Sequence, residues 1–350
     1  MPKEPLIGQV AQGLDRVREL AQPFRAREAA ICAPAIALLL ATGGALGRPV
    51  ESAVAAAAAF SVGFGAHRGF RGTRWAAMVG AALGMTAAAF LGSLLGGWPL
   101  AFLLLSGAVG AVVAWLALHD ENIWWMALQC AIAFFVAGYF AGPPDEAVLR
   151  AGIVAIGGAA QILLVAVLRG FLFEGVALPA GQPAAPRPPL LHSHALRAAI
   201  SVALATFVAD RLGLANGYWA PMTALLILKP GLRDTQTRGF ARLAGTAGGC
   251  AAASLFAIIA LDRAFLLIVA ALATSWLAYA LQKAHYALFT AAVTATVVFF
   301  LALGHISEIA SAEHRIAATL IGGGIALAVA YLGRRRPLSW PRSARDRLGP

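Results

Sequence analysis

Residues 217–249, GYWAPMTALLILKPGLRDTQTRGFARLAGTAGG, join two apolar runs through a basic loop that a proline interrupts. Tyr218 and Trp219 begin the first run, where aromatic rings are typical of a membrane interface. The run ends at Lys229 and Pro230, because proline cannot continue a helix without the loss of a hydrogen bond. The stretch therefore predicts a membrane span, a loop in water and a second membrane span.

The composition of the whole chain favours lipid as its solvent. Of its 350 residues, 60% are hydrophobic and 12% are charged, with a mean hydropathy of +0.76. A soluble domain has about 25% charged residues, whereas a membrane-spanning helix needs roughly 20 mostly apolar ones. Cys32, Cys130 and Cys250 each lie within an apolar run, so we expect them to act as small packing residues.

We predict an all-α integral membrane protein with about twelve transmembrane helices. Two membrane blocks, 29–170 and 195–333, are separated by a proline-rich linker at 171–194. An amphipathic leader, 1–28, and a basic tail, 334–350, flank them. The predicted spans are 29–47, 50–66, 75–96, 98–118, 122–141, 147–168, 196–213, 217–230, 240–260, 264–282, 286–303 and 314–333.

The distribution of basic residues predicts the orientation. The net charge is +11, and the lysines and arginines stand in short gaps between apolar runs, which favours cytoplasmic loops over a nucleic-acid surface. If the N-terminus is cytoplasmic, 22 of the 27 basic residues fall on the cytoplasmic side. Both termini are then cytoplasmic. The outer side holds Arg48, Arg150, Arg211, Arg263 and Arg315.

An offset of 165 residues relates the two blocks. It carries Gly80 and Gly84 onto Gly245 and Gly249, at spacings that let helices approach closely. The same offset carries Arg150, Gly157, Gly158 and Arg169 onto Arg315, Gly322, Gly323 and Arg334. Six spans in each block is an even number, so the pattern predicts two parallel six-helix repeats about an axis along the membrane normal.

The chain has no hydrolytic, metal-binding or nucleotide-binding motif, so we expect no enzymatic role, no cofactor and no metal. His192 and His194 fall in the proline-rich linker, where we expect them to be solvated. The remaining candidates for chemistry are charges near the bilayer, which are costly and usually functional.

The candidate arginines form two groups. Arg150 and Arg315 stand at the outer starts of the sixth and twelfth spans, where they either draw an anion between the halves or snorkel to the headgroups. Arg238 and Arg242 are four residues apart and share a helix face. With Lys229, they either gather anions at the inner mouth or only orient the loop.

The same residues carry a family resemblance. YWAPMTALLILKP followed by TRGFARLAGTAGG resembles the fusaric-acid-resistance and aromatic-acid-exporter family of FUSC-like membrane proteins. The family pattern is a Tyr-Trp pair, a hydroxyl residue, an apolar run to a proline, and then arginines and spaced glycines. The matching residues are Tyr218, Trp219, Thr223, Pro230, Arg238, Gly239, Arg242, Gly245 and Gly249.

The resemblance implies efflux of aromatic or other organic carboxylates across the bacterial inner membrane, in some members with a periplasmic adaptor. Trp219 would stack on a substrate ring, and Thr223 follows it on the same helix. A passive anion channel and a non-transporting scaffold of an envelope complex remain alternatives. Asp210 and Asp234 are the proton carriers that the sequence offers. The expected partners are membrane lipid, an organic anion, and a second copy or an adaptor, with no nucleic acid.

Overall fold

The computed structural model describes residues 24, 26–66, 68–70, 73, 75–172, 191–260, 263–304 and 308–334. Most of the predicted leader (1–28), the centre of the linker (171–194) and all but the first residue of the tail (334–350) lie outside the described residues. Within the described part every regular element is a helix, as the sequence predicts.

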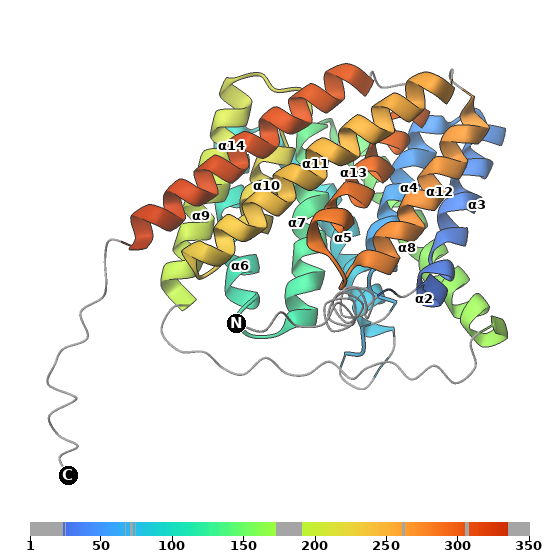
Figure 1. Ribbon diagram of the computed structural model, residues 1–350, viewed down its shortest axis with the longest axis horizontal. Coiled ribbons are helices and arrows are strands. Elements are labelled where there is room, and N and C mark those ends of the chain that lie inside the picture. The colour runs from blue at the N-terminus through green and yellow to red at the C-terminus, as the bar shows by residue number, and fades with distance from the viewer. Residues whose placement is uncertain are drawn as a thin grey trace, which may run out of the picture.

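Twelve helices make up the described bundle, preceded by the short helix α2 (Ala26–Ala30), and Figure 1 shows their arrangement. The first six are α3 (Ala33–Ala45), α4 (Pro49–Gly63), α5 (Ala76–Leu95), α6 (Pro99–Leu116), α7 (Glu121–Tyr139) and α8 (Pro144–Leu172). The second six are α9 (Leu191–Arg211), α10 (Trp219–Ile227), α11 (Leu232–Ala260), α12 (Ala264–Leu281), α13 (Tyr286–Leu303) and α14 (Glu308–Arg334).

Each predicted span overlaps one of these helices, but their lengths differ. Among the described residues, eight helices are long and apolar enough to cross a bilayer, namely α5 to α8 and α11 to α14. Helix α10 has only nine residues, because Leu228 is extended and Pro230 follows it. At 1.5 Å per residue, α10 covers about half of the hydrocarbon core. It is therefore shorter than the span predicted at 217–230.

Glycines set the closest helix contacts, and they do so at equivalent positions in the two halves. Gly157 of α8 lies against the Ala55 carbonyl of α4, and Gly322 of α14 lies against the Ala220 carbonyl of α10. These two contacts are related by the 165-residue offset. In the same way, α5 packs against α7 and α8, and α11 packs against α13 and α14.

The predicted Gly-x-x-x-Gly pairs lie at these helix contacts. Gly245 and Gly249 of α11 face the backbone of α13 at Ala287 and Ala291, so the two helices approach closely there. Their equivalents in α5 lie against α7: Gly80 faces the Met126 sulfur and Gly84 faces the Cys130 sulfur.

The halves interlock reciprocally. The fourth helix of the first half, α6, packs against the first helix of the second half, α9. In return, α12 packs against α2 and α3. Figure 1 shows the end of α8, the start of α9 and the end of α14 on the lower side of the bundle. We call this side the lower end and the opposite side the upper end.

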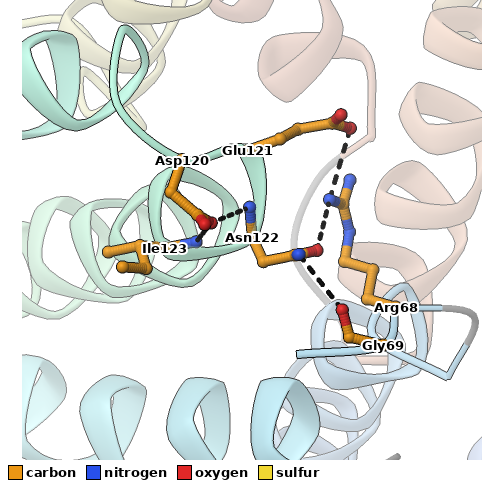
Figure 2. Close-up of polar contacts among 6 residues, drawn as sticks. All are labelled: Arg68, Gly69, Asp120, Glu121, Asn122 and Ile123. Carbon is orange, nitrogen blue, oxygen red and sulfur yellow. Dashed lines mark hydrogen bonds and ion pairs between the residues drawn. The ribbon is translucent and has the colours of Figure 1, made fainter. Parts of the chain in front are cut away.

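The connection before α5 is tied to the start of α7 at the lower end (Figure 2). Asp120 caps α7 and accepts from the backbone N–H groups of Asn122 and Ile123 at 2.8 and 2.9 Å. Arg68 reaches the Glu121 carboxylate at 3.4 Å, and the Asn122 amide donates to the Gly69 carbonyl at 3.2 Å. Residues 68 and 69 therefore lie beside the start of α7.

Two adjacent glycines of α11 test the packing. A Cβ on Gly249 would meet the Ala291 carbonyl, whereas a Cβ on Gly248 would meet nothing within 4 Å. We expect Gly249→Ala to lower the free energy of unfolding by about 1–3 kcal/mol and Gly248→Ala to leave it unchanged or raise it slightly. Thermal unfolding in detergent measures the difference. Equal melting temperatures for the two variants would contradict the α11–α13 contact.

Candidate anion site

Arg315 is a fully buried arginine in the second half. The sequence predicts it at the outer start of a span beginning at residue 314, but α14 begins at Glu308, so Arg315 lies about 10 Å along the helix. Its side chain is only 2% exposed. The snorkelling alternative is therefore wrong for Arg315, because its guanidinium is enclosed by protein.

The guanidinium of Arg315 stacks on an aromatic ring and keeps an unused donor. Its Cζ atom lies 3.6 Å from the centroid of the Trp219 ring, a cation–π contact. Nη2 donates to the Thr294 hydroxyl at 3.3 Å, and Nη1 has no partner among the described residues. The ion pairs found in the described part of the chain are Arg48–Glu51 and Arg68–Glu121, so no carboxylate neutralises Arg315 there.

Arg242 adds a second buried cation. It lies on α11, is 5% exposed, and its Nε–H has no partner among the described residues. Arg242 and Arg315 are close enough to repel each other electrostatically. Two like charges in a medium of low dielectric constant create a region that favours an anion.

Buried hydroxyl groups extend the site along the helices. Thr223 lies one helical turn after Trp219, Thr246 one turn after Arg242, and Thr290 one turn before Thr294, in each case on the same face. None of these three hydroxyl oxygens has a hydrogen-bond partner within the described structure. We call the following set the polar track: Arg238, Arg242, Thr246, Thr290, Thr294, Thr223, Trp219 and Arg315.

Arg238 occupies the lower part of the polar track. Its guanidinium lies 4.2 Å from the centroid of the Tyr286 ring at the start of α13. Gly239, the next residue, is buried against Ile227 and Leu327, which brings α10, α11 and α14 together. Arg238 and Arg242 thus follow one another inward from the lower end, on one face of α11.

Arg150 is equivalent to Arg315 in sequence but not in environment. Its Nη1 donates to the Ser93 hydroxyl at 2.6 Å and to the Phe140 carbonyl. At the position equivalent to Ser93 the second half has Ile258, which offers no acceptor side chain. The hydrogen bonds of Arg150 therefore hold helices together, whereas Arg315 donates to Thr294 through Nη2 and its Nη1 has no partner in the described structure.

Aromatic rings connect the two arginines where the halves meet. Tyr218 and Trp219 do not lie at a water interface as the sequence suggests, because both are 7% exposed. The Tyr218 ring lies 5.1 Å from Trp219 and 6.3 Å from Phe140, and Phe140 lies under Arg150 at 6.0 Å. The aromatic pair thus lies inside the protein, with Trp219 against Arg315, a contact that the sequence does not predict.

Lys229 and Arg238 lie over different aromatic rings. The Lys229 ammonium group is 5.4 Å from the centroid of the Trp124 ring of α7, whereas Arg238 lies over Tyr286 of α13. Pro230 accepts hydrogen bonds from Arg197 at 3.4 Å through its carbonyl. The structure therefore divides the basic loop residues between two places.

Sequence reasoning missed Thr246, Thr290 and Thr294. The last two are four residues apart in an otherwise apolar run, and such a pair marks a polar stripe on one helix face. That signal was available but weak, since single threonines are common in membrane helices.

These apolar helices define a helical membrane protein with the buried arginines Arg242 and Arg315 in its interior. Residues 204–329 match the sequence model of the family described as fusaric acid resistance protein-like. The match includes the whole polar track, so this part of the chain carries a domain of that family. The FUSC-like resemblance is confirmed.

The chain is also similar to a protein of Neisseria gonorrhoeae described as uncharacterized protein ORF2. The two are 30% identical over 142 residues, which cover 40% of this chain and 33% of that protein. The match thus spans about a third of the relative's length. No solved structure matches the chain.

The cost of burying Arg315 gives a prediction about stability. We expect Arg315→Met to raise the free energy of unfolding by about 1–3 kcal/mol, because it removes an uncompensated charge from the interior. Arg211→Met, at an exposed arginine over Phe207, should change it little. Thermal unfolding in detergent compares them. A large loss of stability in Arg315→Met would instead make Arg315 a structural residue.

Proposed function

We propose that this protein is a membrane transporter that moves aromatic or other organic carboxylate anions out across the bacterial inner membrane. The observation that carries the proposal is the buried Arg315 guanidinium, stacked on Trp219 with an unused Nη1–H donor and no carboxylate partner in the described structure. The fusaric acid resistance protein-like match over residues 204–329 supports a transport function.

The chemistry of the site suits this class of substrate. A carboxylate would accept from Arg315 Nη1 and from the free Nε–H of Arg242, forming charge-assisted hydrogen bonds. An aromatic body would find the Trp219 ring beside the charge. An arginine within a span costs at least about 2.5 kcal/mol, and a bound anion offsets that cost because the interior screens charge weakly.

The proposed architecture is twelve spans in two parallel six-helix repeats. The paired Gly157–Ala55 and Gly322–Ala220 contacts, separated by the same 165-residue offset, support the repeat. The reciprocal packing of α6 on α9 and of α12 on α3 supports it too. The lower end faces the cytoplasm in this proposal, together with both termini, because the basic residues gather there.

The polar track gives the proposed path a direction. Arg238 and Arg242 would gather anions near the lower end, and the threonines of α10, α11 and α13 would pass them toward Arg315 and Trp219. A half-length helix such as α10 is found beside the substrate site in other transporters. A passive anion channel is the second candidate, because the same unpaired arginines serve conduction. The proposed protein partner is a second copy of this chain or a periplasmic adaptor.

Proteoliposomes that contain the purified chain test the proposal. Uptake of labelled benzoate should fall at least about tenfold in Arg315→Gln and in Arg242→Gln, because each removes one charge-assisted interaction. Arg211→Gln should transport normally, as an exposed arginine outside the polar track. Normal benzoate transport in both Arg315→Gln and Arg242→Gln would contradict the proposal that these arginines bind the anion.

Counterflow separates the two candidates. Vesicles loaded with unlabelled benzoate should accumulate the labelled acid transiently above its external concentration if the protein is a carrier. A channel shows no such accumulation beyond what the membrane potential explains, and that result would replace the transporter by the channel.

A further inference from the structure

A cavity lies between the two halves at the lower end, and no residue of the polar track is among those that line it. Its volume is about 100 Å³. Helices α6 and α7 of the first half and α9 and α10 of the second half enclose it. The lining residues are Val113, Ala114, Ala117, Leu118, Trp124, His194, Ala198, Leu225, Leu228, Lys229 and Pro230.

His194 is the buried polar group of this cavity. The expectation that it is solvated in a linker is wrong, because α9 already begins at Leu191 and His194 is only 3% exposed. The proline-rich composition of 171–194 concealed this early helix start. The Nδ1 atom of His194 is buried and has no hydrogen-bond partner among the described residues. A buried ring nitrogen without a partner is costly, and a ligand or a proton would satisfy it.

Lys229 provides the fixed charge of the same cavity. Its ammonium group lies over the Trp124 ring at 5.4 Å and also lines the cavity wall. The walls contributed by α6, α7, α10 and the rest of α9 are apolar. A small cavity with an apolar body and two nitrogen bases on one side fits a ligand with one anionic head.

The charges that face His194 come from two elements. Arg197 is on α9 itself, and Lys229 is on the α10–α11 turn; α6 and α7 place only apolar side chains on the cavity. At the far end of α14, Gly333 lies against Arg197. Burial, and after it the nearby charges of Arg197 and Lys229, lower the pKa of His194 to about 4. His194 lies ahead of the apolar stretch that starts at residue 196.

The pKa of Lys229 is also lowered, to about 8, first by burial and then by Arg238, while Asp234 opposes the shift. Lys229 therefore remains largely charged at neutral pH, and His194 remains neutral. Asp210 and Asp234, the proton carriers suggested by the sequence, are both exposed. The cavity thus holds a buried imidazole that burial and the neighbouring cations Arg197 and Lys229 keep neutral.

We propose that this cavity binds the carboxylate group of a small apolar anion against Lys229, and that His194 takes up a proton as the anion binds. The proposal rests on the transport function, since it makes the cavity the proton-linked loading site at the cytoplasmic side. The carboxylate accepts from the Lys229 ammonium and from the protonated His194 ring. The proton comes from water, and it leaves His194 when the anion moves on.

The sign of the pH dependence follows from linkage. A bound anion favours the charged imidazole, so the pKa of His194 is higher in the complex than in the free protein. The complex then binds more protons than the free protein between about pH 4 and the ordinary histidine pKa of about 6.5. Affinity therefore rises as pH falls through that window. Affinity also falls as pH rises above about 8, because Lys229 then loses the proton that gives it its charge.

Calorimetry on the full chain in detergent, with benzoate as the probe, tests this proposal. Arg315→Gln is the background, so that the polar track does not contribute. Benzoate should bind about tenfold more tightly at pH 5.5 than at pH 7.5 if the complex restores the ordinary histidine pKa. Titrations in two buffers with different ionisation enthalpies should show uptake of about one proton per benzoate at pH 5.5.

Two variants and one control decide the outcome. His194→Gln should retain the pH 7.5 affinity but lose the pH dependence and the proton uptake. His192→Gln, at an exposed histidine two residues away, should match the background. Ala117→Phe fills the cavity and should abolish binding while His194 stays in place.

The failures are distinguishable. Benzoate binding that is independent of pH, or pH dependence that survives His194→Gln, would overturn the proton-linked cavity and leave the transport function intact. Absence of benzoate transport in the protein with an intact Arg315 would remove the proposed function itself.

Discussion

The guanidinium group of Arg315, enclosed by helices and stacked on Trp219, is the interaction on which the account of this protein depends. Water and lipid headgroups would solvate that charge at the surface of a bundle, and a carboxylate would neutralise it in an ordinary core. The described structure provides neither, apart from one hydroxyl contact to Thr294. Glycine-mediated contacts of α11 with α13 keep the surrounding backbone close, so the charge is held in place with an open donor.

The two halves have several helix contacts at corresponding positions but differ in the side chains placed there. The Arg150 guanidinium donates hydrogen bonds to the Ser93 hydroxyl and the Phe140 carbonyl. At the positions equivalent to Trp219 and Arg242, the first half has Val54 and Ala77, which offer neither ring nor charge. The family match at residues 204–329 falls on the half that contains these groups. The first half therefore acts as a partner that closes the interior, through α6 and α7, around the half that carries the site.

The sequence predicts a helix at each of the twelve apolar runs, because hydropathy marks them, and it identifies Trp219, Arg242 and Arg315 as candidates. It does not predict that these three groups meet, because that depends on which helices pack together. Arg315 was expected at a membrane surface since Glu308 and Glu313 hide the early start of α14. His194 was assigned to a linker because nearby prolines conceal the first turn of α9. The sequence groups Lys229 with Arg238, and it does not predict that they lie over rings of different helices, Trp124 of α7 and Tyr286 of α13.

The most direct test of the central claim is to locate a bound anion. In crystals of the protein grown with 4-iodobenzoate, anomalous X-ray scattering locates the iodine, and the electron density locates the carboxylate. The account predicts the carboxylate beside Arg315 and Arg242 with the ring against Trp219. An Arg315 guanidinium paired with a carboxylate of the protein itself, and no ligand beside it at saturating 4-iodobenzoate, would contradict the claim that this buried charge is reserved for an anion.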